Sequence, residues 1–199
     1  CRRALSGAYN RRMNLPSRPL IALLWVALCA VAPAATAASA STTPNFDSRT
    51  SQLRGADLPV ATEVVVHKSE RRLEIFERGR RLREFRIALG GDPVGHKLFE
   101  GDSRTPEGRY LLTARNPRSE FFLSMQVSYP NAADMARARK IGRRPGGLIM
   151  VHGQPNEPKR SVRYYESEDW TDGCIALSNA DMMEFWLLVP ANTPIDIRP

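Results

Sequence analysis

Residues 61–89 read "ATEVVVHKSERRLEIFERGRRLREFRIAL". Apolar and polar residues alternate in three short runs, at 64–67, 72–76 and 84–89. Alternation with a period of two is typical of a half-buried strand. Charged or turn-forming pieces separate the runs, and one of them contains Gly79. The stretch therefore predicts a β-meander and a fold built mainly from strands.

Later segments extend the same pattern. Further strands are predicted at 109–116, 121–129, 147–153 and 193–198, and "CIAL" (174–177) is a short strand candidate. Helices are predicted at 131–142 and 178–190, because Asn131 and Ser178 are good N-cap residues and Gly142 and Pro190 are good terminators. We expect one mainly β domain with two or three short helices over residues 60–199.

The beginning of the chain has the order of a secretory signal. Residues 20–32 are apolar and uncharged, arginines precede them, and small residues follow. Pro33 ends the apolar run before the about 20 residues that a bilayer span needs. We expect 1–40 to be a cleaved signal, with Met13 as an alternative start, and 41–59 to be a flexible linker. The mature protein is then expected in the periplasm, with no stable membrane span.

The net charge of +8 overstates the basic character of the expected mature protein. Residues 1–40 hold five arginines and no acidic residue, so the rest of the chain carries only +3. Nucleic-acid binding needs a basic face in a compartment that contains nucleic acid. Export argues against such a partner, and we expect none.

Cysteine usage directs attention to one residue. The chain contains Cys1, Cys29 and Cys174, and removal of the expected signal leaves only Cys174. A single cysteine in an oxidising compartment cannot form an internal disulfide. Cys174 is therefore either a buried inert side chain or a functional thiol.

Several catalytic motifs are absent from the sequence. The run "GGDPVGHK" (90–97) resembles a phosphate loop, but His96 displaces Lys97 and Leu98 stands where a hydroxyl is needed. The sequence contains no S-x-x-K, G-x-S-x-G or H-E-x-x-H motif, and its three histidines are scattered. We expect neither a metal nor a cofactor.

Cys174 and His152 remain as a candidate catalytic pair. A cysteine nucleophile acts as its thiolate, and a nearby imidazole can accept the thiol proton. His152 ends a predicted strand, and Gly153 permits a close backbone approach. Gly173 places Cys174 in a tight turn, where the two amides would face a developing oxyanion.

The order of motifs over residues 60–199 resembles the L,D-transpeptidase catalytic domain family (YkuD-like). The resemblance implies a β-sandwich-like fold of mixed sheets. It also implies an exported enzyme that acts on peptidoglycan stem peptides through a cysteine acyl-enzyme. The motifs that carry it are "LGGDPVGHKLFEGDSRTPEGRY" (89–110), "YPNAADMARA" (129–138), "PGGLIMVHGQPN" (145–156) and "TDGCIALSN" (171–179).

The resemblance also implies roles for four residues. Cys174 would be the nucleophile and His152 the base. Gly153 would orient the imidazole through its backbone carbonyl, and Gly173 would help to form the oxyanion site.

Two positions depart from the family pattern. Asp172 stands where a histidine usually precedes the Gly-Cys pair, and Ala176 replaces an arginine that often follows the cysteine. Thr171 and Asp172 are candidate substrate contacts. Arg143 and Arg144 are candidates for binding a substrate carboxylate that Ala176 leaves uncovered.

An aromatic group precedes the cysteine motif. Tyr164, Tyr165 and Trp170 are candidates for a lid or a sugar-contacting rim, although such residues are often packing residues.

The expected function is that of an exported L,D-transpeptidase. It would form an acyl-enzyme with tetrapeptide stems and transfer the acyl group to an amine, giving a crosslink or attaching a wall-linked lipoprotein. One alternative keeps the site but uses water, giving an L,D-carboxypeptidase or amidase. An alternative of another class is a non-catalytic wall-binding domain in which Cys174 is vestigial.

Overall fold

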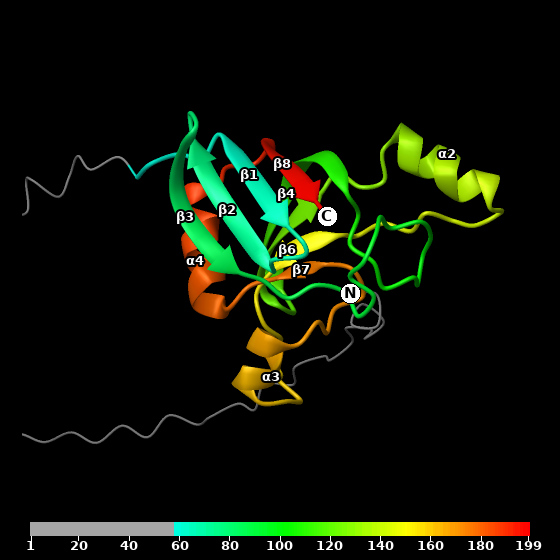
Figure 1. The fold of residues 1–199 in the computed structure, drawn as a ribbon. Helices are drawn as coiled ribbons and strands as arrows, with labels where there is room; N and C mark the ends of the chain where they lie inside the picture. Colours follow the sequence, from blue (N-terminus) through cyan, green and yellow to red (C-terminus); the bar gives the residue numbers. More distant parts are fainter. Residues whose placement is uncertain (1–57) are drawn as a thin grey trace, which may run out of the picture. The chain divides into compact units, whose positions relative to one another are not determined.

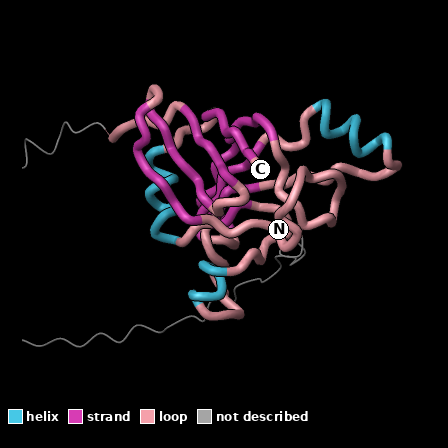
Figure 2. The backbone as a smooth tube through the Cα atoms, viewed as in Figure 1, coloured by secondary structure: helices cyan, strands magenta, loops and turns pink. Residues whose placement is uncertain are grey.

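The computed structural model describes residues 58–199. The predicted signal at 1–40 lies outside the described residues, as does the predicted linker apart from residues 58 and 59. Residues 58–199 form one mixed sheet of eight strands with three short helices, which confirms the predicted mainly β fold (Figure 1; Figure 2). The strands are β1 (Glu63–His67), β2 (Arg72–Glu77), β3 (Arg80–Arg86), β4 (Gly108–Ser119), β5 (Phe122–Val127), β6 (Met150–His152), β7 (Ile175–Ala176) and β8 (Thr193–Arg198). The helices are α2 (Ala132–Lys140), α3 (Val162–Ser167) and α4 (Asn179–Leu188).

The strand order in the sheet is β3-β2-β1-β8-β4-β5-β6-β7. The first three strands form the predicted antiparallel meander. The C-terminal strand β8 then lies in the middle of the sheet, where Ile195 pairs with Val64 of β1 in parallel and with Tyr110 of β4 in the antiparallel sense. The end of the chain therefore joins the meander to the strands that carry the candidate site.

The third strand differs from its prediction. It runs from Arg80 to Arg86 rather than over residues 84–89, and Ala88 bridges to Ala176 of β7 instead. The two residues exchange backbone hydrogen bonds, from Ala88 N to Ala176 O at 2.9 Å and from Ala176 N to Ala88 O at 2.8 Å. The alternation ends at this point, because Ile87, Ala88 and Leu89 are all buried. This bridge links the chain after β3 to the strand at the opposite edge, so the sheet curls around its core.

The core fills the inside of the curled sheet. It includes fully buried side chains from the meander, from the central strands and from α4, such as Leu73, Leu112, Phe185 and Ile195.

The helices begin where the sequence predicts N-caps. The Asn131 side chain accepts hydrogen bonds from two backbone amides of α2, and the Ser178 side chain accepts one from Asp181 N of α4. Helix α2 lies at the tip of a loop excursion away from the sheet (Figure 1; Figure 2). The third helix, α3, lies in the polar stretch between His152 and Thr171. No helix within residues 58–199 is long and apolar enough to cross a membrane.

Candidate active site

His152 is the last residue of β6 and is 99% buried, with a relative exposure of 1%. Its Nδ1 atom lies 2.7 Å from the Gly153 carbonyl oxygen. A carbonyl only accepts, so Nδ1 carries a proton and, in the neutral ring, Nε2 carries the lone pair. Nε2 is buried and has no hydrogen-bond partner among the described residues. The imidazole is thus held in the tautomer that can take a proton at Nε2.

Gly153 fixes the end of β6 from several sides. Its N–H lies 3.0 Å from Phe121 O and 3.2 Å from Leu123 O. A Cβ atom at this position would lie 2.6 Å from Asn179 Oδ1 and 2.9 Å from Phe122 Cβ. A larger residue would therefore displace the carbonyl that orients His152.

Aromatic side chains enclose the imidazole. The Phe121 ring centroid lies 4.8 Å from that of His152, and the Trp170 ring lies 5.6 Å away, edge to face. Tyr165 is buried and packs on Trp170, whose Nε1 donates to the Tyr165 carbonyl. Tyr164 is the exposed member of the predicted aromatic group, beside Tyr165. Phe121 was not predicted as a site residue, since nothing in the sequence around it indicates a contact with position 152.

The cysteine turn is closed by Thr171. The Thr171 hydroxyl donates to Cys174 O at 2.8 Å and accepts from Gly173 N at 3.1 Å. The Gly173 amide is therefore engaged by the turn in this structure, and an oxyanion would have to share it. Thr171 is buried and acts as a support for the turn.

Gly173 is required by the close approach of another loop. Its φ is +116°, and a Cβ atom would lie 2.4 Å from Arg104 O. Gly90 is similarly confined, with a hypothetical Cβ 1.9 Å from Ser103 O and 2.9 Å from Gly173 N. The glycines of the two motifs therefore allow residues 90, 103–104 and 173 to pack directly on one another.

An ion pair anchors the chain before the cysteine turn. The Arg71 guanidinium donates to both carboxylate oxygens of Asp169, at 2.6–3.1 Å, and Leu89 N donates to Asp169 Oδ1 at 2.8 Å. Thr171 N donates to Leu89 O at 3.0 Å. These hydrogen bonds fix the position of the cysteine turn relative to the meander.

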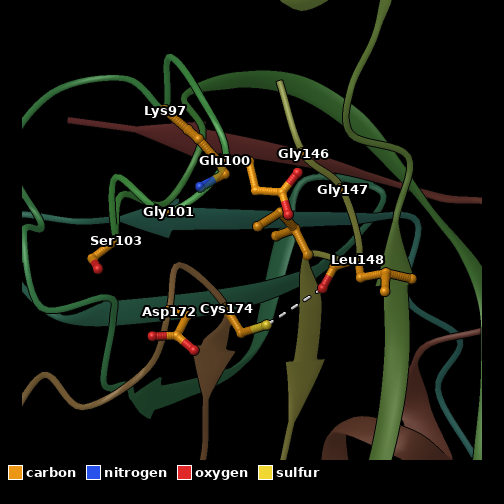
Figure 3. A pocket seen from close by; sticks show the side chains of 10 residues that line it. Lys97, Glu100, Gly101, Ser103, Gly146, Gly147, Leu148, Asp172 and Cys174 are labelled. Atoms are coloured by element: carbon orange, nitrogen blue, oxygen red, sulfur yellow. Dashed lines mark hydrogen bonds between the residues drawn. The ribbon is translucent and has the colours of Figure 1, made fainter. Parts of the chain in front are cut away.

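Cys174 is 2% exposed, and its Sγ lies 3.6 Å from the Leu148 carbonyl oxygen (Figure 3). Burial raises the pKa of the Cys174 thiol, but the His152 imidazole and the Met150 backbone N–H together outweigh burial and lower it below the usual thiol value. No hydrogen bond of ordinary geometry joins His152 Nε2 to another described atom, so this effect comes from the proximity of the two side chains. The arrangement supports a thiolate nucleophile beside a proton acceptor.

The thiol and the imidazole open on different cavities. Cys174 lines a cavity of about 260 Å³, whereas His152 lines one of about 210 Å³. Leu148 lines both cavities, and its backbone has a φ of +56°. The Cys174 cavity is formed by Lys97, Glu100, Gly101, Ser103, Gly146, Gly147, Leu148, Ile149, Asp172 and Cys174 (Figure 3).

The remaining predicted residues divide between the site and its surroundings. Asp172 is exposed and lines the Cys174 cavity, whereas Ala176 is buried in the sheet and lies outside it. The Arg143 guanidinium lies 4.5 Å from the centre of the Phe99 ring. The Arg144 carbonyl accepts from Glu100 N at 2.8 Å. Neither arginine lines the Cys174 or the His152 cavity.

Comparisons with known proteins give a consistent result. Residues 61–197 match the YkuD family, described as the L,D-transpeptidase catalytic domain. No curated protein sequence matches the chain. Among solved structures, the helical cell shape determining protein Pgp2 from Campylobacter jejuni is 28% identical with a TM-score of 0.55, over 69% of this chain and 47% of that one. Bd1075 from Bdellovibrio bacteriovorus is 25% identical with a TM-score of 0.51, over 70% of this chain and 48% of that one. The chain thus spans about half the length of these two similar structures.

Proposed function

Because this chain belongs to the L,D-transpeptidase catalytic domain family, we propose that it is a periplasmic acyltransferase of peptidoglycan with Cys174 as its nucleophile. The observation that carries the proposal is the buried Cys174 thiol with a lowered pKa beside His152, whose ring Gly153 orients. The periplasmic location rests on the signal predicted for residues 1–40.

In the first half-reaction, the Cys174 thiolate attacks the carbonyl after the L-centre of a diaminopimelate residue in a tetrapeptide stem. His152 takes the thiol proton at Nε2, which carries the lone pair. The tetrahedral intermediate collapses to a thioester as the C–N bond breaks. His152 returns the proton to the departing nitrogen, and D-alanine leaves as a free amine. Charge and protons balance without a further reactant.

In the second half-reaction, an amine of another stem attacks the thioester and loses a proton to His152, and Cys174 leaves as the thiolate. The product is an amide crosslink, or a lipoprotein attached to the wall if the amine belongs to a lysine. The exposed Asp172 carboxylate in the Cys174 cavity supports an amine acceptor, because a negative charge attracts an approaching ammonium. Water at the same step would make the protein a carboxypeptidase or amidase.

A role in cell shape is part of the proposal. Pgp2, one of the similar structures, is described as a helical cell shape determining protein. We propose that acyl transfer by this chain likewise alters the wall in a way that changes cell shape. The corresponding test is the shape of cells that lack the protein or carry only its Cys174→Ala variant.

The biochemical test is incubation of the protein with purified tetrapeptide stems, followed by mass spectrometry of peptides and intact protein. The proposal predicts D-alanine release, a thioester on Cys174 and crosslinked product when an amine-bearing stem is present. The Cys174→Ala variant should give none of these. If the products are tripeptides and no crosslinked peptide forms, the protein is a hydrolase rather than a transferase. If no stem forms a thioester on Cys174, the catalytic proposal is overturned.

A further inference from the structure

A buried lysine lines the cavity that contains the nucleophile. Lys97 is 4% exposed, and its side chain and Cys174 both line the cavity of about 260 Å³. Figure 3 shows Lys97 and Cys174 coming from different loops around this cavity. The mechanism proposed above gives Lys97 no role, although a buried ammonium is costly unless its hydrogen bonds are satisfied.

Lys97 has one acceptor among residues 58–199, the Asp102 Oδ1 atom at 2.7 Å. An ammonium carries three donor protons, so two remain for a ligand. The side chain is therefore more than nine-tenths buried, borders the cavity and is incompletely paired within the described part of the chain.

The Asp102 carboxylate does not fully neutralise the positive charge of Lys97. Asp102 accepts three backbone N–H groups of its own loop, from Leu98 at 2.7 Å, Phe99 at 3.1 Å and Arg104 at 3.1 Å. Although burial raises the pKa of Asp102, Lys97 and these amides lower it below the usual value, so the carboxylate stays ionised. Because backbone dipoles already stabilise this anion, the ammonium can still attract a second anion from the cavity.

From these contacts we infer that Lys97 binds the free C-terminal carboxylate of the acyl donor. The proposal rests on the function proposed above and adds the residue that recognises the terminal carboxylate of the tetrapeptide donor. Lys97 is a specificity-determining residue in this account, because its ammonium touches the leaving group rather than the reacting carbonyl. The bonds broken and formed are those of the first half-reaction.

The size of the cavity agrees with a small leaving group. Drug-sized ligands occupy pockets of about 300–1,000 Å³, and the Cys174 cavity is smaller. A single terminal D-alanine fits such a volume better than a longer peptide. Glu100 and Asp172 also line this cavity, and Lys97 is the only cationic residue among the described residues of its lining, so it is the side chain there whose charge favours a carboxylate.

The first test compares two donors on the unaltered protein. One is a tetrapeptide with a free C-terminal carboxylate, and the other is the same peptide with a C-terminal carboxamide. We expect kcat/KM for thioester formation to be at least about tenfold higher for the acid, as for a charge-assisted hydrogen bond. Equal values for the two donors would overturn the inference while leaving the proposed function intact. Failure of both donors to acylate Cys174 would overturn the proposed function and the inference with it.

Variants separate recognition from loop stability. Lys97→Met should reduce the ratio of acid to amide to about one, mainly through KM, and Lys97→Arg should restore part of it. Asp102→Asn is the matched control, because it breaks the same ion pair but leaves the ammonium in the cavity. If the ion pair only stabilises the loop, Lys97→Met and Asp102→Asn will slow both donors alike and leave the ratio unchanged, which would contradict the inference. Circular dichroism shows whether each variant is folded. If a variant does not fold, the comparison of the two donors on the unaltered protein still tests the inference.

Discussion

The two ends of the sheet are built in different ways. At one end, β3, β2 and β1 are strands of seven, six and five residues that follow one another along the chain. At the other end, β6 and β7 have three and two residues, and loops from distant parts of the chain hold them in place. The comparison teaches that backbone pairing positions the meander, whereas packing between loops positions the candidate active site.

Two glycines make this difference concrete. Gly79, in the turn between β2 and β3, has a φ of +82° and no atom within 4 Å of a hypothetical Cβ. Gly173, before the nucleophile, has a φ of +116°, and its hypothetical Cβ would lie 2.4 Å from Arg104 O. The first glycine meets only a conformational requirement, whereas the second must also make room for another loop.

The largest effect on acylation is therefore expected from Gly173→Ala. Strain together with the clash should lower the free energy of unfolding by about 3 kcal/mol. It should also abolish rapid thioester formation, because the turn that carries Cys174 must move. Gly79→Ala is the matched control and should cost about 1–2 kcal/mol, the strain of a left-handed residue alone. Thermal unfolding and acylation kinetics measure both, and equal effects of the two variants would refute the distinction between the two ends.

A smaller effect is expected from the aromatic support of the imidazole. Phe121→Ala should slow acylation about fivefold, since a ring contact is worth about 1 kcal/mol. Phe85→Ala in the meander is the control: it should lower the free energy of unfolding by about 3–5 kcal/mol while leaving the acylation rate of the folded protein unchanged. Pre-steady-state acylation rates and denaturant titrations test the pair. A slower reaction in the Phe85 variant than in the Phe121 variant would contradict this assignment.

The meander could be predicted because its information is local. Alternation places Val64, Val66, Leu73 and Ile75 inside, and all four are fully buried. The error at residues 84–89 has a physical origin, since alternation reports burial on one face but not the strand with which a residue pairs. Ala88 is buried like its neighbours Ile87 and Leu89, and it pairs with Ala176, a residue 88 positions later.

The site could be predicted only in part. The types of Cys174, His152 and the adjacent glycines indicate their chemistry, so these residues could be selected from the sequence. Phe121 could not be assigned, because its contact with His152 arises from long-range packing. Lys97 lies within the motif at 89–110, but the motif does not show that its side chain lines the Cys174 cavity. The prediction of Arg143 and Arg144 as carboxylate ligands rests on their charge alone. Neither arginine lines the Cys174 cavity, whereas the buried Lys97 does.

The smallest effect is expected from the exposed charge at the site. Asp172→Asn should lower the ratio of crosslinked to hydrolysed product less than tenfold, because an exposed charge contributes about 1 kcal/mol or less and is screened by salt. The difference between Asp172 and its variant should shrink as ionic strength rises. Product ratios at low and high salt measure it, and a ratio that is unchanged at low salt would remove Asp172 from acceptor selection.

The central claim is that His152 activates Cys174, and the pH dependence of alkylation at Cys174 tests it most directly. Since the pKa of the thiol is lowered, the thiolate fraction and the reaction rate should rise at a lower pH than in a free cysteine, which titrates near about 8.5. Peptide mass spectrometry assigns the label to Cys174. The account predicts that His152→Ala moves the midpoint of the profile to higher pH, because burial then acts without the imidazole. A variant whose profile coincides with that of the unaltered protein would contradict it.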